Sequence, residues 1–171
     1  MATLPEITRV LTAHPAVRRA ETALVHDNEN KVAVAAVEVS EYVSGPVLRN
    51  HVWRELGVDS GLAGVLITER IPTVDGAVDA QCLAAAVAEG RCTLYSHPRD
   101  DAERRLVAIW SARMDVPSVG VDDDFLELGG DSLSALSIVD AVETEFGRPL
   151  DVYEFVSAAT IRRLAEILQL R

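Results

Sequence analysis

The stretch Leu-Gly-Gly-Asp-Ser-Leu, residues 128–133, decides the fold of the C-terminal part of this 171-residue chain. A glycine pair ends a loop there, and Asp131, a good helix-capping residue, follows it. Ser132 opens an amphipathic helix predicted over residues 132–146, which ends where glycine and proline follow. The buried stripe expected on this helix consists of Ala135, Ile138, Val139, Val142 and Phe146. The sequence therefore predicts a serine at the first turn of a core-packed helix.

The segment around this helix, residues 100–171, contains helical and loop patterns only. A second long helix is predicted over residues 101–114, with Leu106, Val107, Ile109, Trp110 and Met114 around one stripe. A loop over residues 115–131 follows, and a short turn of helix is expected near residues 152–156. Thr160 caps a last helix, whose apolar spacing is i, i+3, i+4, i+7 from Ile161. The prediction is a four-helix bundle of three main helices and a short one.

Residues 1–90 mix helical and strand patterns and predict a small α+β domain, with residues 91–99 as a linker between Gly90 and Asp100. Helices are expected over residues 5–13, 46–56 and 79–88, and strands over 17–26, 32–39 and 64–71. Turns are expected at residues 27–30 and at Asp75-Gly76. A domain of about ninety residues lies within the size range that folds alone.

The charge of the chain argues against nucleic acid or an anionic membrane as a partner. The formal net charge is −11, and the isoelectric point is about 4.7. Residues 1–97 hold 8 basic and 12 acidic residues, a net −4, while residues 98–171 hold 8 and 15, a net −7. Phosphate groups would be repelled by such a surface. The composition favours basic partner surfaces instead.

Compartment signals indicate a reduced, cytoplasmic setting. The two cysteines, Cys82 and Cys92, form neither a disulfide framework nor a closely spaced redox pair. No apolar run approaches the length of a membrane span. Residues 1–6 carry neither a basic start nor an apolar core, so no signal peptide is expected.

An acidic run, Asp122-Asp123-Asp124, precedes the serine. An EF-hand calcium loop needs oxygen ligands at alternate positions, but the fifth position counted from Asp122 is Leu126. No metal site is therefore predicted. A solvated acidic loop is the default interpretation, and a docking surface for a basic transferase is the functional alternative.

The stretch from Asp122 to Phe125, Glu127, the sequence 128–133 and the apolar helix together resemble the modification site of thiotemplate carrier proteins, the thiolation domains of nonribosomal peptide synthetases. In that family the serine carries covalent 4′-phosphopantetheine taken from coenzyme A. The resemblance assigns Ser132 as the attachment point, with Gly130 and Asp131 beside it. A phosphodiester there would lie at a helix N-terminus, where backbone N–H groups and the helix dipole favour negative charge. Asp59-Ser60 is the same dipeptide without this context, and we interpret it as a cap or turn.

Leu133 and Leu136 lie off the core stripe of the serine helix. A pair of exposed leucines beside a modified serine is suited to contact with partner enzymes, although packing against the preceding loop is the alternative.

Gly-Asp-Ser-Leu also matches the tetrapeptide of GDSL-type esterases, in which the serine is a nucleophile. Such a serine needs a histidine base, which that family places near its C-terminus. All four histidines here precede Ser132 (His14, His26, His51 and His97), and the 39 residues after it contain none. That family also uses a much larger α/β domain. The esterase interpretation is therefore rejected.

The N-terminal segment resembles the small C-terminal subdomain of adenylation domains, which precedes carrier domains in nonribosomal peptide synthetases. The resemblance rests on residues 14–18, the hairpin, the helix at Pro46 and residues 71–79. At the position where that family carries its catalytic lysine, this chain has Ala77, which supplies neither charge nor donor. The chain also lacks a phosphate-binding loop. We therefore expect no adenylation activity, and the domain is either a structural remnant or a docking platform.

These resemblances imply a carrier, not an enzyme, that holds an aminoacyl or acyl group as a thioester in nonribosomal peptide or hybrid natural-product biosynthesis, such as that of antibiotics. The implied partners are a phosphopantetheinyl transferase, a separate adenylating enzyme, and a condensation or tailoring enzyme. Two alternatives stay open: an unmodified interaction protein, and half of a split unit completed by a separate adenylation core.

Overall fold

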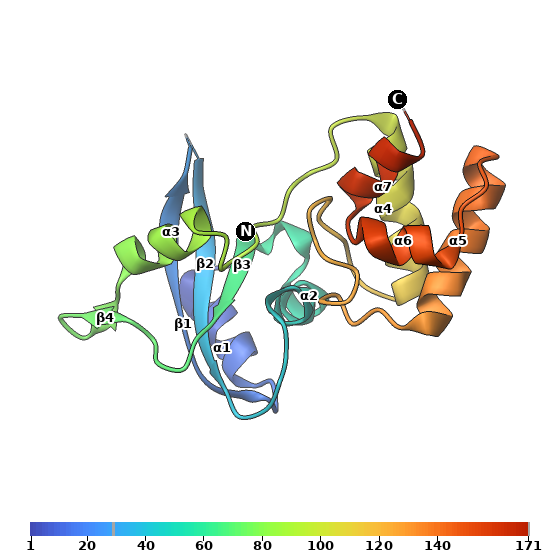
Figure 1. Ribbon diagram of the computed structural model, residues 1–171. Helices are drawn as coiled ribbons and strands as arrows, with labels where there is room; N and C mark the ends of the chain where they lie inside the picture. Colours follow the sequence, from blue (N-terminus) through green and yellow to red (C-terminus); the bar gives the residue numbers. More distant parts are fainter. Residues whose placement is uncertain (29, 171) are drawn as a thin grey trace. The chain divides into compact units, whose positions relative to one another are not determined.

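The computed structural model describes residues 1–28 and 30–170, and these divide into two compact units, Met1–Leu94 (unit 1) and Tyr95–Arg171 (unit 2). Two residues lie outside the described ones: Glu29 of the predicted 27–30 turn, and Arg171 at the end of the predicted C-terminal domain. The division falls within the segment expected to be a linker. Unit 1 contains helices and a small sheet, and unit 2 contains helices (Figure 1).

Unit 1 is built on a three-stranded sheet in the order β1-β2-β3, with β1 at Val17–Asp27, β2 at Asn30–Val39 and β3 at Leu62–Ile67. β1 and β2 are antiparallel, and β2 and β3 are parallel. The central strand β2 is buried throughout 33–37, and its side chains alternate between two core clusters. The β3 strand begins and ends earlier than predicted. It ends early because the chain leaves the sheet after Ile67, and the N–H of Ile71 donates to the Glu38 side chain instead.

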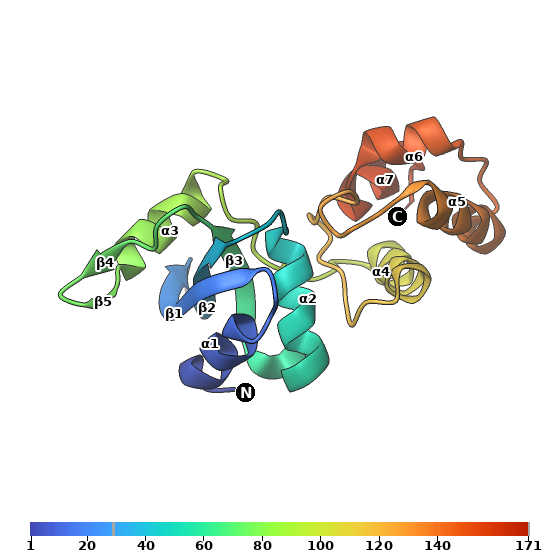
Figure 2. The same cartoon turned by 90° about the horizontal axis from the view of Figure 1, so that it is seen from below.

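Helices cover both faces of this sheet. α1 (Leu4–Thr12) and α2 (Gly45–Leu56) share one core cluster, and α3 (Ala80–Ala88) contributes to the other. Figure 2 shows these helices around the sheet from below. A short 3-10 turn, η1 (Val58–Ser60), follows α2. The hairpin of β4 (Thr73–Val74) and β5 (Ala77–Val78) turns at Asp75 and Gly76, which both have positive φ, as the sequence predicts.

Unit 2 contains four helices within its described residues: α4 (Asp101–Met114), α5 (Ser132–Phe146), α6 (Val152–Ala158) and α7 (Ile161–Ile167). The bounds of α4 and α5 coincide with the prediction. The expectation of three main helices and one short one is wrong, because α7 is only 7 residues long. Leu168 closes it as the C-cap, so two long and two short helices enclose the core.

An aromatic cluster lies in the core of unit 2. The rings of Trp110, Phe125 and Phe155 are each at most 1% exposed and meet edge to face, with centroids 4.9–5.7 Å apart. These residues come from α4, from the loop before α5 and from α6. The predicted α5 stripe is buried except for Phe146, which is half-buried.

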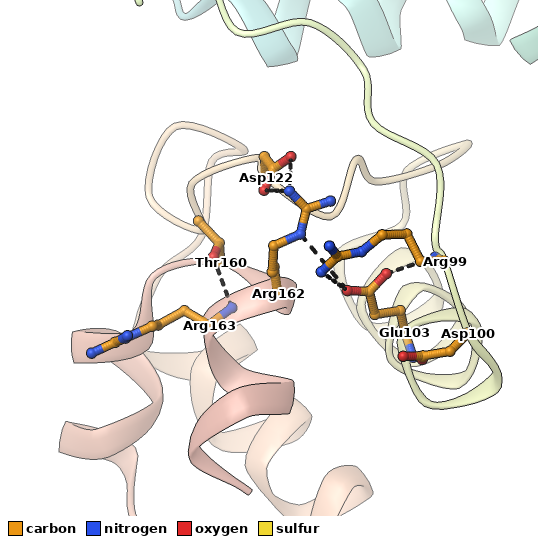
Figure 3. Close-up of polar contacts among 7 residues, drawn as sticks. All are labelled: Arg99, Asp100, Glu103, Asp122, Thr160, Arg162 and Arg163. Carbon is orange, nitrogen blue, oxygen red and sulfur yellow. Dashed lines mark hydrogen bonds and ion pairs between the residues drawn. The ribbon is translucent and has the colours of Figure 1, made fainter. Parts of the chain in front are cut away.

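A polar network ties the start of α4 to the long loop and to α7 (Figure 3). The Glu103 carboxylate, 3% exposed, accepts hydrogen bonds from the backbone N–H of Arg99 (2.7 Å) and from its guanidinium (3.2 Å). Arg162 Nε lies 3.8 Å from the same carboxylate, and Arg162 Nη1 pairs with Asp122 at 2.7 Å. Asp100 caps α4 by accepting the N–H of Glu103 at 2.8 Å. The buried acid Glu103 thus joins the start of α4 to α7 through Arg162, which in turn joins the loop through Asp122.

We predict that Glu103→Ala lowers the free energy of unfolding of unit 2 by about 1–3 kcal/mol, because two cations and a backbone N–H lose their shared acceptor. The matched control is Asp101→Ala, which removes an exposed pair with Arg104 and should cost less than about 1 kcal/mol. Hydrogen exchange of buried α4 and α5 amides in the full chain measures both. Equal costs for the two variants would contradict the network's role.

Candidate functional site

The side chains of the acidic run before the serine make hydrogen bonds and ion pairs within unit 2. Asp122 pairs with Arg162, and Asp123 is fully buried with Oδ2 accepting the Gly120 N–H at 2.6 Å. Asp124 accepts the N–H groups of Leu126 (2.8 Å) and Glu127 (3.2 Å). The expected solvated acidic loop is therefore wrong, because each carboxylate satisfies donors inside unit 2. The described residues contain no cluster of three or more potential metal ligands.

The position of the loop's end is fixed by Gly130 lying directly against Phe125. A Cβ on Gly130 would come within 2.5 Å of the Phe125 ring and of its carbonyl oxygen. The Gly130 N–H donates to that carbonyl at 3.0 Å, and the Phe125 N–H donates to Ala159 O at 2.7 Å. Gly130 is thus required by core packing, an explanation that sequence reasoning missed. Gly129 differs, because its φ of +88° favours glycine while the space beside it is open.

Asp131 and Ser134 form a reciprocal cap at the start of α5. Asp131 Oδ1 accepts the Ser134 N–H at 2.8 Å, and Ser134 Oγ accepts the Asp131 N–H at 2.9 Å. The Ser134 N–H and the Ser134 hydroxyl, which donates to Asp131 Oδ1 at 2.9 Å, hold the pKa of the Asp131 carboxyl below its usual value. The Asp131 cap was predicted from the sequence, whereas the part of Ser134 was not, although the Asp-x-x-Ser spacing could have indicated it.

Ser132 is the first residue of α5, and its side chain is exposed. Among the described residues no hydrogen bond engages its hydroxyl, so neither a base nor a cap occupies it. Ser60, in the same Asp-Ser dipeptide, is 1% exposed in η1. The hydroxyl of Ser132 is therefore accessible to another molecule, whereas that of Ser60 is not.

The two leucines singled out in the sequence are both exposed, Leu133 by 77% and Leu136 by 55%. Leu126, which the sequence analysis did not single out, is 63% exposed in the loop before α5. Neither α5 leucine packs into the core cluster of unit 2. Ala77 belongs to unit 1, where it lies exposed on β5 directly after the hairpin turn.

Residues 104–168, which run from α4 through α7, match the protein-family model described as "Phosphopantetheine attachment site". This segment is a phosphopantetheine-attachment domain. Such a domain carries 4′-phosphopantetheine, which comes from coenzyme A and is bound covalently. The expectation drawn from residues 122–133 is confirmed at the level of the family.

Comparison with known proteins extends the similarity into unit 1. Gramicidin S synthase 2 from Brevibacillus brevis is 33% identical over 166 residues, which cover 95% of this chain and 4% of that synthase. Tyrocidine synthase 2 from Brevibacillus parabrevis is 33% identical over 163 residues, covering 85% of this chain and 4% of that synthase. The chain thus spans a small fraction of these relatives.

A solved structure of the phosphopantetheine transferase Sfp in complex with coenzyme A and a peptidyl carrier protein is also similar. The matched chain of that structure is 28% identical, with a TM-score of 0.43, and the match covers 45% of this chain and 100% of the matched chain. No helix within residues 1–28 and 30–170 is long and apolar enough to cross a membrane.

The start of α5 fits a phosphopantetheine group in this attachment domain. The Ser132 hydroxyl is exposed, and a methyl group placed on Gly129 would meet no atom within 4 Å, so the approach is open. The first-turn N–H groups of α5 and the positive end of its dipole favour a phosphodiester. The group supplies a thiol that can form a thioester, while the chain's own residues supply its attachment point and its electrostatic surroundings.

We predict that Gly130→Ala destabilises the attachment domain by about 1–3 kcal/mol, because the added methyl group overlaps Phe125. Gly129→Ala is the matched control and should cost about 1 kcal/mol through its positive φ alone. Asparagine, which tolerates positive φ, separates the two causes. Gly129→Asn should cost less than Gly129→Ala, whereas Gly130→Asn should cost at least as much as Gly130→Ala.

Hydrogen exchange of buried α4 and α5 amides in the full chain measures these four variants. If asparagine relieved the cost at Gly130, backbone conformation and not contact with Phe125 would be the constraint.

Proposed function

We propose that the protein is a carrier in nonribosomal peptide or hybrid biosynthesis, with Ser132 as the residue that takes 4′-phosphopantetheine and with an aminoacyl or acyl group held on its thiol. The observation that carries the proposal is an exposed, uncommitted serine at the first residue of α5, within a segment that matches the phosphopantetheine attachment family. Asp131 and Gly130 act beside it, the first as the cap and the second by its packing.

The chemistry at Ser132 is performed by a separate transferase. The Ser132 hydroxyl oxygen forms a bond to the phosphorus of coenzyme A that carries the phosphopantetheine. The bond from that phosphorus to the leaving nucleotide breaks, and the hydroxyl proton goes to a base of the transferase. Within this chain, the cap by Asp131 and Ser134 stabilises the first turn, and the contact of Gly130 with Phe125 fixes where the turn begins. The residues thus orient the hydroxyl without activating it.

The proposed partners are a phosphopantetheinyl transferase, a separate adenylating enzyme, and a condensation or tailoring enzyme. Leu133 and Leu136 are the proposed contacts, because both expose most or half of an apolar side chain beside Ser132. The flexible arm would let one cargo visit several enzymes at a raised effective concentration.

Unit 1 is proposed to be an adenylation C-terminal-subdomain-like module that lacks catalytic capacity. The support is its mixed sheet and helices and the similarity to synthetases over 95% of the chain. At the expected position of the catalytic lysine, Ala77 follows the hairpin turn with no charge to offer. We favour a docking role for this unit over a purely structural one.

We predict that incubation of the full chain with coenzyme A, Mg²⁺ and a broad-specificity transferase adds one phosphopantetheine, detected by intact mass. Ser132→Ala should abolish the gain, and Ser60→Ala should retain it, because Ser60 is buried in the same dipeptide. No gain under conditions that modify a control carrier would favour an unmodified interaction protein instead.

We predict that the 171-residue chain forms no aminoacyl adenylate with ATP, because Ala77 cannot stabilise the charge that develops in that reaction. Amino-acid-dependent exchange of pyrophosphate into ATP is the measurement, with an intact adenylation enzyme as the positive control. Exchange above background with any amino acid would contradict the assignment. Exchange that needs a separately expressed adenylation core would support the split-unit alternative.

A further inference from the structure

A groove of about 410 Å³ opens beside Ser132, between the end of α4 and the start of α5. Its lining consists of Arg113, Met114, Leu128, Gly129, Asp131, Leu133, Ser134 and Ser137. All of these residues belong to unit 2, and both neighbours of Ser132, Asp131 and Leu133, contribute to it. A group attached to Ser132 therefore has an adjoining surface on its own domain.

Of the two exposed leucines of α5, only Leu133 lines this groove. Successive helical residues are about 100° apart, so Leu133 shares a face with Ser137, whereas Leu136 shares one with Ser132. Leu133 lines the groove and Leu136 does not. Leu133 thus lies between the point of attachment and the groove, while Leu136 faces elsewhere.

Arg113 brings an uncommitted positive charge into this groove. Five other arginines of unit 2 pair with carboxylates: Arg99, Arg104, Arg105, Arg162 and Arg163. Among residues 95–170, by contrast, Arg113 donates only a long hydrogen bond, 3.4 Å, to Ser137 Oγ, and has no carboxylate partner. Its guanidinium can therefore donate hydrogen bonds to an incoming acceptor.

The chemistry of the lining matches a phosphopantetheine arm. Such an arm carries methyl groups, a hydroxyl and two amides beyond its phosphate. Ser137 lies five residues after Ser132, about 7.5 Å along the helix axis, so Arg113 beside it would meet the amides and not the phosphate. Leu128, Met114 and Leu133 offer apolar contacts to the methyl groups. The tether to Ser132 raises the arm's local concentration over any free ligand.

We propose that this groove seats the phosphopantetheine arm against its own domain, with Arg113 and Ser137 hydrogen-bonding an amide carbonyl of the arm. The proposal rests on the proposed attachment at Ser132. While no partner enzyme holds the arm, it lies over Leu133 and along α4 and α5. A partner enzyme that receives the cargo must then draw the arm out of the groove.

The test uses the full chain, labelled with ¹³C and ¹⁵N and converted with unlabelled coenzyme A, so that isotope-filtered NOEs report contacts of the arm alone. Intact mass is recorded first for every sample. We expect NOEs from the arm's methyl groups to the Met114 methyl, weakened at least twofold in Arg113→Ala. The matched control is Arg148→Ala, which changes an exposed arginine outside the groove and should leave the NOEs unchanged.

The possible failures are distinguishable. A converted protein whose arm contacts only Leu136, or contacts no residue of the groove, would overturn the seat but not the attachment. Unchanged Met114 NOEs in Arg113→Ala would also overturn the assigned role of that guanidinium. A sample that gains no mass would refute the attachment itself, and with it the seat.

Discussion

The close contact between Gly130 and Phe125 is the constraint on which the rest of the site depends. Phe125 belongs to the buried aromatic cluster, so its position is set by Trp110 of α4 and Phe155 of α6. Only a residue without a Cβ fits over its ring and carbonyl. The chain must therefore leave the core at Gly130, and α5 begins two residues later, with Ser132 outside. Core packing thereby determines which hydroxyl is accessible.

Electrostatics in this protein are organised locally, although the chain is strongly acidic overall. The carboxylates of the loop before α5 accept backbone N–H groups or pair with Arg162, so the loop's charge holds its own shape. Glu103 extends this network to Arg99, at the junction with the linker. The Asp131 carboxylate caps the N-terminus of α5. An acidic composition therefore does not by itself identify a docking surface.

The sequence predicted the parts of the fold whose signals are local. The bounds of α4 and α5 follow because capping aspartates at 100 and 131 coincide with apolar periodicity, and Gly147 ends α5. The position of Ser132 follows from the same signals. What failed depends on contacts between distant residues, which periodicity does not report. The burial of Glu103 and of Asp123 and the reason for Gly130 all depend on tertiary packing.

In the proposed function, the helical bundle of unit 2 holds a mobile arm that carries its cargo as a thioester. The most direct measurement is tandem mass spectrometry of the Ser132-containing peptide, isolated from cells in which the biosynthetic pathway is active. We expect a phosphopantetheine on that serine, with an acyl or aminoacyl group on a fraction of the molecules. A side chain that is always bare in such cells would contradict it.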